Sequence, residues 1–285
     1  MEQEFIEDPQ TADFTQIAKD IESASIIISS CRRSGKTHLT REIMYHMGKV
    51  YKVDLCLLFS NTASYNPDFE YVSEFYKYDG LDEALLKKFV NQQKETMKLH
   101  RAMTKKNKSY HKQPTKLAII FDDVAHEKNL FYSDVIGELF IMARHIKVMV
   151  VFLTQHLNAL SPKMRNNADV IISFRDPNWN NRRTLQDQFM TLSSMNRKLV
   201  QQYMDKCLGE AYRCIVVCVY KVQQANTLSD YIYTYKAQKN GPKFRLGQKE
   251  FWNKQLATKT NYKKSQLEME DKHLKGFLKY FFLNI

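Results

Sequence analysis

Short runs of apolar, often β-branched residues recur along the chain and are separated by segments with helical spacing. The runs cover residues 25–29, 53–59, 117–122, 148–153, 170–174 and 214–220, and a weaker run covers 231–236. Several are apolar at consecutive positions, which is typical of strands buried on both faces of a parallel sheet. The intervening segments 37–48, 81–103, 130–146, 181–192 and 196–206 have helical periodicity. This alternation predicts an α/β three-layer domain with a mostly parallel central sheet.

Length and composition favour one large core, since the chain has 285 residues of which 44% are hydrophobic. Residues 103–116 are polar and basic and contain Pro114, so we expect a long exposed loop there. Gly241-Pro242 opens a Lys-rich, helix-favouring stretch, which predicts a domain at 1–240 and a basic C-terminal extension at 241–285. No run of about 18 apolar residues occurs, so no membrane span is expected, and the acidic start predicts no secretory signal.

The net charge of +12 is concentrated in two segments. Residues 94–116 contain eight Lys or Arg and one acidic residue, and residues 236–285 contain twelve and four. The rest of the chain is therefore slightly acidic. Such concentrated basic charge favours a polyanionic partner, most often nucleic acid. The five cysteines have no spacing that suits zinc, and reduced thiols are expected.

The first apolar run leads into a loop with the features of a phosphate-binding site. Residues 23–47 read SASIIISSCRRSGKTHLTREIMYHM, a strand-like run followed by a small-residue loop and an amphipathic segment. The pattern G-x-x-x-x-G-K-[ST] is matched from Ser30 to Thr37, with Ser30 in the place of the first glycine. If the loop required a positive φ at that position, serine would be strained there.

In such a loop, backbone N–H groups and the N-terminus of the following helix bind phosphates. Lys36 is expected to reach the β- and γ-phosphates of ATP, and the Thr37 hydroxyl to bind Mg²⁺. The residues predicted to contact the nucleotide are Ser30, Cys31, Arg32, Arg33, Ser34, Gly35, Lys36, Thr37 and His38.

A second apolar run, in KLAIIFDDV at 116–124, ends in two carboxylates. Mg²⁺ keeps much of its hydration shell, so Asp122 is expected to hold it through water. Asp123 is then placed to activate the attacking water as general base. Glu127, a few residues further along, is the alternative base.

A third apolar run ends in Thr154-Gln155. A polar amide at the carboxyl end of a neighbouring strand can contact the γ-phosphate or orient water, so Gln155 is a candidate catalytic residue. Arg144, Arg165 and Arg175 are candidates for an arginine that acts on a neighbouring subunit's nucleotide. Arg32 and Arg33 offer an alternative within the same chain.

Together, the segments SSCRRSGKT, IIFDDV, ARHIKVMVVFLTQ and SPKMRNNADVIISFR resemble the poxvirus-type genome-packaging ATPases of large DNA viruses, of the FtsK–HerA branch of P-loop ATPases. The resemblance covers roughly residues 15–240. It implies a RecA-like core, a homo-oligomeric ring and ATP-driven translocation of double-stranded DNA into a preformed capsid. It also implies capsid or portal proteins as partners, and action at virus assembly sites in the host cytoplasm with association with the virion.

The same resemblance matches Lys36 and Thr37 to the Walker A motif, Asp122 and Asp123 to Walker B, and Gln155 to the sensor position. It makes Arg165 the arginine expected to act in trans. Two other functions stay open at this point: a nucleotide-gated scaffold that binds DNA or capsid, and a DNA helicase on the same core. A terminase-type motor is disfavoured, because no cluster of carboxylates for a nuclease follows residue 240.

Overall fold

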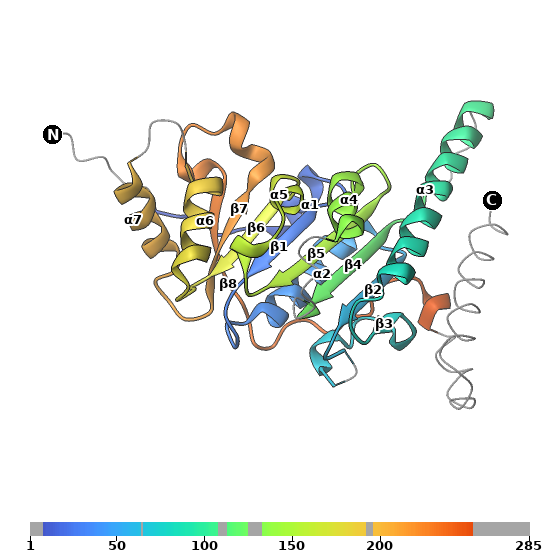
Figure 1. Cartoon of the computed structure of the whole chain (residues 1–285), viewed down its shortest axis with the longest axis horizontal. Coiled ribbons are helices and arrows are strands. Elements are labelled where there is room, and N and C mark those ends of the chain that lie inside the picture. The colour runs from blue at the N-terminus through green and yellow to red at the C-terminus, as the bar shows by residue number, and fades with distance from the viewer. Residues whose placement is uncertain (1–7, 64, 108–112, 125–132, 192–195, 253–285) are drawn as a thin grey trace.

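A central eight-stranded sheet organises the chain (Figure 1). The computed structural model describes residues 8–63, 65–107, 113–124, 133–191 and 196–252. The strands are β1 (Ser25–Ser29), β2 (Leu55–Ser60), β3 (Lys77–Tyr78), β4 (Leu117–Asp122), β5 (Val148–Thr154), β6 (Val170–Phe174), β7 (Arg213–Cys218) and β8 (Ile232–Lys236). Their order is β3-β2-β4-β5-β1-β6-β7-β8. All neighbours from β3 to β6 are parallel, whereas β6–β7 and β7–β8 are antiparallel. The predicted α/β class with a mostly parallel sheet is confirmed.

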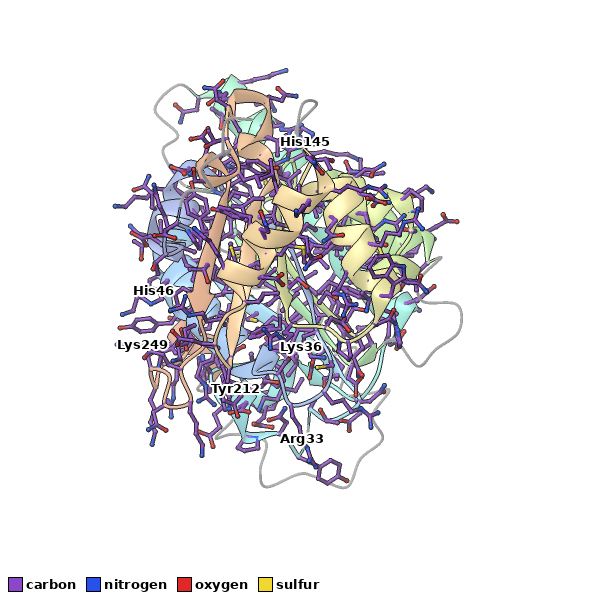
Figure 2. The ribbon with its side chains drawn as sticks, turned by 90° about the vertical axis from the view of Figure 1, so that its left-hand side faces the viewer. Arg33, Lys36, His46, His145, Tyr212 and Lys249 are labelled. Carbon is purple, nitrogen blue, oxygen red and sulfur yellow. The ribbon has the colours of Figure 1, made fainter. Side chains whose placement is uncertain are left out.

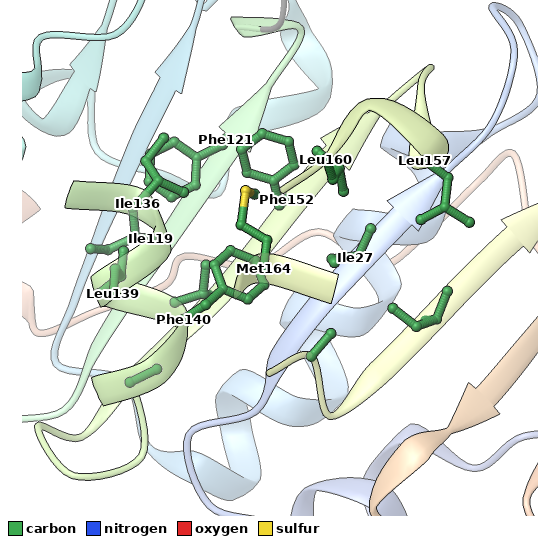
Figure 3. Close-up of a cluster of buried hydrophobic side chains, with 14 of the residues drawn as sticks. Ile27, Ile119, Phe121, Ile136, Leu139, Phe140, Phe152, Leu157, Leu160 and Met164 are labelled. Atoms are coloured by element: carbon green, nitrogen blue, oxygen red, sulfur yellow. The ribbon is translucent and has the colours of Figure 1, made fainter. Parts of the chain in front are cut away.

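Helices cover both faces of this sheet and give the expected three layers. They are α1 (Phe14–Asp20), α2 (Lys36–Tyr51), α3 (Glu83–Lys106), α4 (Asp134–Met142), α5 (Pro162–Asn166), α6 (Trp179–Phe189) and α7 (Arg197–Cys207). Alternate side chains of a strand point to opposite faces. Ile26 and Ile28 therefore pack with buried residues of α1 and α2, while Ile27 belongs to the core on the opposite face. Figure 3 shows that second core, where Phe121 and Phe152 meet side chains from α4 and α5.

The consecutive apolar positions of the strands are explained by burial on both faces. Every residue of β1, β2, β4, β5 and β6 is buried. The elements β3 and α5 were not predicted, because two and five residues are too few to show a period.

Several predicted boundaries differ from the structure. The expected helix at 130–146 is shorter, since α4 ends at Met142 and a turn with positive φ at Lys147 leads into β5. The expected strand at 214–220 ends at Cys218, because a 3₁₀ helix begins at Val219. The predicted loop at 103–116 starts later, since α3 continues to Lys106. Residues 108–112 lie outside the described residues.

The first part of the expected C-terminal extension packs on the domain. The Gln248 N–H donates to the Asp54 carbonyl at 2.9 Å, and Phe251 lies in the core against the Tyr76 ring. Residues 253–285 lie outside the described residues, so the boundary at residue 240 stays a prediction. Among the described helices, none combines the length and the apolar character needed to cross a membrane.

Gly247 permits the close approach between this segment and the start of β2. Its φ is 92°, and a Cβ there would lie 2.9 Å from the Asp54 carbonyl oxygen. Gly247→Ala is therefore expected to lower the free energy of unfolding by about 2 kcal/mol, measured by urea denaturation. Gly209→Ala is the matched control, since its Cβ would meet its nearest atom at 3.6 Å. Equal losses in the two variants would contradict this role of Gly247.

Candidate nucleotide-binding site

The loop between β1 and α2 presents an uncapped helix N-terminus at the carboxyl edge of the sheet. Gly35 is the N-cap of α2 with φ of 101°, no side chain caps it, and the first turn contains no acidic residue. The free N–H groups and the positive end of the helix dipole therefore remain available to an anion. The loop is fixed at its start, because the Ser30 N–H donates to the Thr154 carbonyl of β5 at 3.0 Å.

Ser30 carries no backbone strain. The residues with positive φ in this loop are Arg33, at 62°, and Gly35. The condition under which serine would be strained is thus not met, and the left-handed conformation falls elsewhere in the loop. The Ser30 side chain instead braces the loop, since the Ser34 hydroxyl donates to the Ser30 hydroxyl at 2.6 Å.

Lys36 is half-buried and lies near two carboxylates, Asp122 and Asp123. Its ammonium group donates to the Ser30 carbonyl, with an Nζ–O distance of 3.4 Å. Burial lowers the pKa of Lys36, whereas Asp122 and Asp123 oppose that shift. A cation held in this way at a helix N-terminus is suited to a phosphate chain.

Asp122 is the last residue of β4 and is only 6% exposed. Parallel pairing sets it beside Ser60 of β2, whose hydroxyl donates to Asp122 Oδ2 at 3.3 Å. Burial raises the pKa of Asp122 to about 6; Asp123 adds to this shift, and Lys36 and the Ser60 hydroxyl oppose it. A carboxylate that has lost so much hydration would gain from a cation.

Asp123 and Gln155, both predicted from the sequence as catalytic residues, are joined by a hydrogen bond. Gln155 Nε2 donates to Asp123 Oδ1 at 3.2 Å, and Asn61 Nδ2 donates to the Asp123 carbonyl at 3.0 Å. Asp123 has φ of 51°, an unfavourable conformation for a non-glycine residue. The Gln155 hydrogen bond therefore holds the Asp123 carboxylate, and the Asn61 hydrogen bond holds its backbone at the sheet edge.

A buried asparagine that the sequence analysis missed orients Gln155. Asn181, on α6, is 3% exposed and uses both amide hydrogens. Its Nδ2 donates to the Gln155 carbonyl at 2.8 Å and to Asp176 Oδ2 at 2.7 Å. The signal in the sequence is an asparagine at a core-facing position of a helix, which is informative only once the facing residues are known.

Two cavities meet at Lys36. The larger, of about 430 Å³, is lined by Arg33, Ser34, Gly35, Lys36, Thr37, His38, Asp68, Tyr212, Ala237 and Lys239. The smaller, of about 200 Å³, is lined by Arg32, Lys36, Asp123, Leu153, Thr154, Gln155 and His156. In Figure 2, Arg33, Lys36 and Tyr212 lie in one region of the molecule. The larger cavity suits the nucleoside end of a nucleotide, and the smaller suits the terminal phosphate and an attacking water.

The residues present fit a magnesium ion that is shared with a nucleotide. Thr37 and Asp122 offer the hard oxygen ligands that Mg²⁺ prefers. Among the described residues, no three His, Cys, Asp or Glu side chains form a metal-binding group. The phosphates would therefore have to complete the coordination, as is usual for Mg²⁺ in ATPases.

Arg165 does not reach the site of its own chain. Its Nη1 donates to the Asn158 and Leu160 carbonyls, at 2.9 and 2.8 Å, and it lines neither cavity. Arg32 and Arg33 do line them. The role of Arg165 in trans stays a prediction, and Glu127 lies outside the described residues.

The raised pKa of Asp122 predicts a pH-dependent stability. Its pKa rises from 3.8 to about 6 on folding, so its protonated form favours the folded state. The stability it contributes is complete below pH 4 and is lost as the pH rises through about 6. In EDTA without nucleotide, the free energy of unfolding of the native protein, measured relative to Asp122→Asn, should fall by roughly 2 kcal/mol over that window. Asp134→Asn, which removes an exposed carboxylate, controls for the change in net charge. If the free energies of unfolding of the native protein and Asp122→Asn ran parallel with pH, the raised pKa of Asp122 would be contradicted.

Comparison with known proteins gives relatives of low identity. No protein-family model matches the sequence. The chain is 25% identical over 229 residues to the uncharacterized protein L437 of Acanthamoeba polyphaga mimivirus, covering 80% of this chain and 76% of that protein. It is 24% identical over 190 residues to the uncharacterized protein 075L of Invertebrate iridescent virus 6, covering 66% of this chain and 67% of that protein.

Solved structures provide the fold. EssC (ATPases 2 and 3) from Geobacillus thermodenitrificans superposes with a TM-score of 0.52 and 13% identity, over 85% of this chain and 44% of that chain, so the present chain spans less than half of EssC. The pCW3 conjugation coupling protein TcpA, solved with ATPγS, superposes with a TM-score of 0.53 and 14% identity, over 91% of this chain and 73% of that chain. The genome packaging NTPase B204 of Sulfolobus turreted icosahedral virus 2 superposes with a TM-score of 0.47 and 17% identity, over 76% of this chain and 97% of that chain. The likeness to EssC and TcpA shows the fold: the chain has the mostly parallel α/β fold of P-loop ATPases such as EssC.

Proposed function

We propose that the protein is an ATP-hydrolysing motor that translocates double-stranded viral DNA into a preformed capsid. The observation that carries the ATPase assignment is the hydrogen bond from Gln155 to Asp123, beside a phosphate loop whose Lys36 faces Asp122 and Asp123. A protein that only binds a nucleotide needs the phosphate loop but not an oriented carboxylate at the position of the attacking water.

The residues have distinct roles in this reaction. The loop N–H groups and Lys36 bind the β- and γ-phosphates, while Thr37 and Asp122 would hold Mg²⁺, which neutralises phosphate charge. Asp123 accepts the proton of the attacking water, and the Gln155 amide holds the carboxylate and orients that water. Arg32 lines the same cavity and can stabilise charge that develops on the γ-phosphate.

Basic charge supports DNA as the partner. The chain carries a net charge of +12, and the last turns of α3 extend beyond the sheet with Arg101, Lys105 and Lys106 exposed (Figure 1). Contacts to phosphates suit a motor that must ignore base sequence. We further propose a homo-oligomeric ring in which Arg165 acts in trans, capsid or portal proteins as partners, and action at virus assembly sites in the host cytoplasm.

Two alternatives make different predictions. A nucleotide-gated scaffold would bind ATP without rapid turnover, and the Asp123–Gln155 contact disfavours it. A helicase on the same core would separate strands, which a strand-displacement assay distinguishes from packaging.

The decisive experiment is steady-state ATP hydrolysis with and without long double-stranded DNA. We expect DNA-stimulated turnover, with a loss of about 10²–10⁴ in kcat for Asp123→Asn because the general base is removed. Asp134→Asn is the matched control, since the Asp134 side chain is 84% exposed.

The remaining outcomes discriminate between the alternatives. Hydrolysis that survives Asp123→Asn would move the general base to Glu127, and turnover indifferent to DNA would count against a translocating motor. Bound ATP without any turnover would favour the gated scaffold.

The end of α3 should contribute to DNA affinity through charge alone. Replacing Arg101, Lys105 and Lys106 by glutamine is expected to reduce the slope of log K against log salt by about 2–3, because each phosphate contact contributes roughly 0.9. Fluorescence anisotropy with duplex DNA across a salt series measures this slope. A control that replaces the exposed Lys19, Lys49 and Lys52 removes the same charge from the opposite layer; equal slopes in the two triple variants would exclude α3 as the contact.

A further inference from the structure

Tyr212 is an exposed aromatic residue with a strained backbone at the wall of the larger cavity. It lies in the turn between α7 and β7, its φ is 63°, and it is 57% exposed. A Cβ built on Gly35 would lie 3.5 Å from Tyr212 Cδ1, so the ring borders the N-cap of the phosphate-loop helix. A large side chain in the left-handed region costs stability, and a ring that is more than half exposed returns little packing. This combination points to a ligand.

The antiparallel end of the sheet explains why Tyr212 is beside the phosphate loop. Because β7 and β8 reverse the strand direction alternately, the start of β7 and the end of β8 meet at the edge where β1 ends. The Ala237 N–H donates to the Tyr212 carbonyl at 3.0 Å, and Ala237 and Lys239 continue the cavity wall.

This wall is tied to the phosphate-loop helix by a buried carboxylate. Glu42 of α2 is 3% exposed and accepts from the Gln238 N–H at 2.7 Å and from the Tyr235 hydroxyl at 2.5 Å. The distance between the ring and the helix N-terminus is thus set by the fold before a ligand arrives.

We propose that Tyr212 is the platform on which the base of the bound nucleoside triphosphate stacks; this rests on the proposed nucleotide-binding function. The helix N-terminus and Lys36 fix the phosphate end, and the cavity of about 430 Å³ leads from there to the tyrosine ring. Any base has a face that an aromatic ring can stack on, and larger purines gain more contact than pyrimidines. Because purines gain more stacking contact, the ligand class is a purine nucleoside triphosphate, with adenine or guanine as the base. Asp68 also lines the cavity, where its carboxylate already accepts from Arg41 Nη2 at 2.8 Å.

The test compares ATP with inorganic triphosphate, which lacks the base, by isothermal titration of the full chain. Tyr212→Ala should weaken ATP about 10-fold or more while leaving triphosphate unchanged. Tyr212→Phe keeps the ring and should bind ATP as the native protein does. ATP and GTP should bind more tightly than CTP and UTP, and this difference should shrink in Tyr212→Ala. Tyr65→Ala is the matched control, because Tyr65 is 89% exposed and does not line the cavity.

The outcomes distinguish a failure of the Tyr212 platform from a failure of the proposed nucleotide-binding function. Unchanged ATP affinity in Tyr212→Ala overturns the platform, even if ATP and triphosphate bind normally to the native protein. Equal losses for ATP and triphosphate also overturn it, since Tyr212 would then act through the phosphate loop or the fold. If neither ligand binds the native protein, the proposed nucleotide function itself fails.

Discussion

The site depends on a set of opposite charges formed by Lys36, Asp122 and Asp123, of which Asp122 is buried and the other two are half-buried. The lysine loses hydration and gains partial compensation from the carboxylates, while burial and Asp123 raise the pKa of Asp122. Burial therefore disfavours the charged forms of both Lys36 and Asp122, and the neighbouring charges offset this only in part. A phosphate chain with its cation would offset both costs, because the anion would meet Lys36 and the cation would meet Asp122. Relief of this desolvation cost when the ligand binds would therefore contribute to the affinity of the site for it.

Such charges can be held together only by a rigid support, and the strand order supplies it. β1 lies between β5 and β6, and β4 pairs with the other edge of β5, so the phosphate loop, Gln155 and the two carboxylates emerge at one edge of the sheet. Cores on both faces fix these strands. Most of the fold thus serves to bring together side chains that are far apart in the sequence.

The part of this arrangement that could be predicted from the sequence is the part encoded locally. Continuous apolar runs predicted the buried strands, and the Gly35-Lys36-Thr37 sequence predicted a loop between a strand and a helix, which the structure shows to line a cavity. The walls of the larger cavity could not be predicted in this way. Tyr212, Asp68 and Lys239 come from three distant segments, and only the pairing of β7 with β8 and the packing beside α2 place them together. Arg165 was assigned through resemblance, and its contacts with its own loop became visible only in three dimensions.

The link between Gln155 and α6 shows how the site depends on distant packing. Asn181 has two amide hydrogens, and it donates one to the Gln155 carbonyl and one to Asp176. Because Asn181 holds the Gln155 backbone in place, the Gln155 side-chain amide can donate to Asp123 Oδ1. A buried polar group that lost its partner would be costly, so Asn181 stabilises this arrangement of α6 and the end of β5. The orientation of Asp123, the proposed general base, consequently depends on α6, a helix that follows β6 and lies outside the phosphate loop.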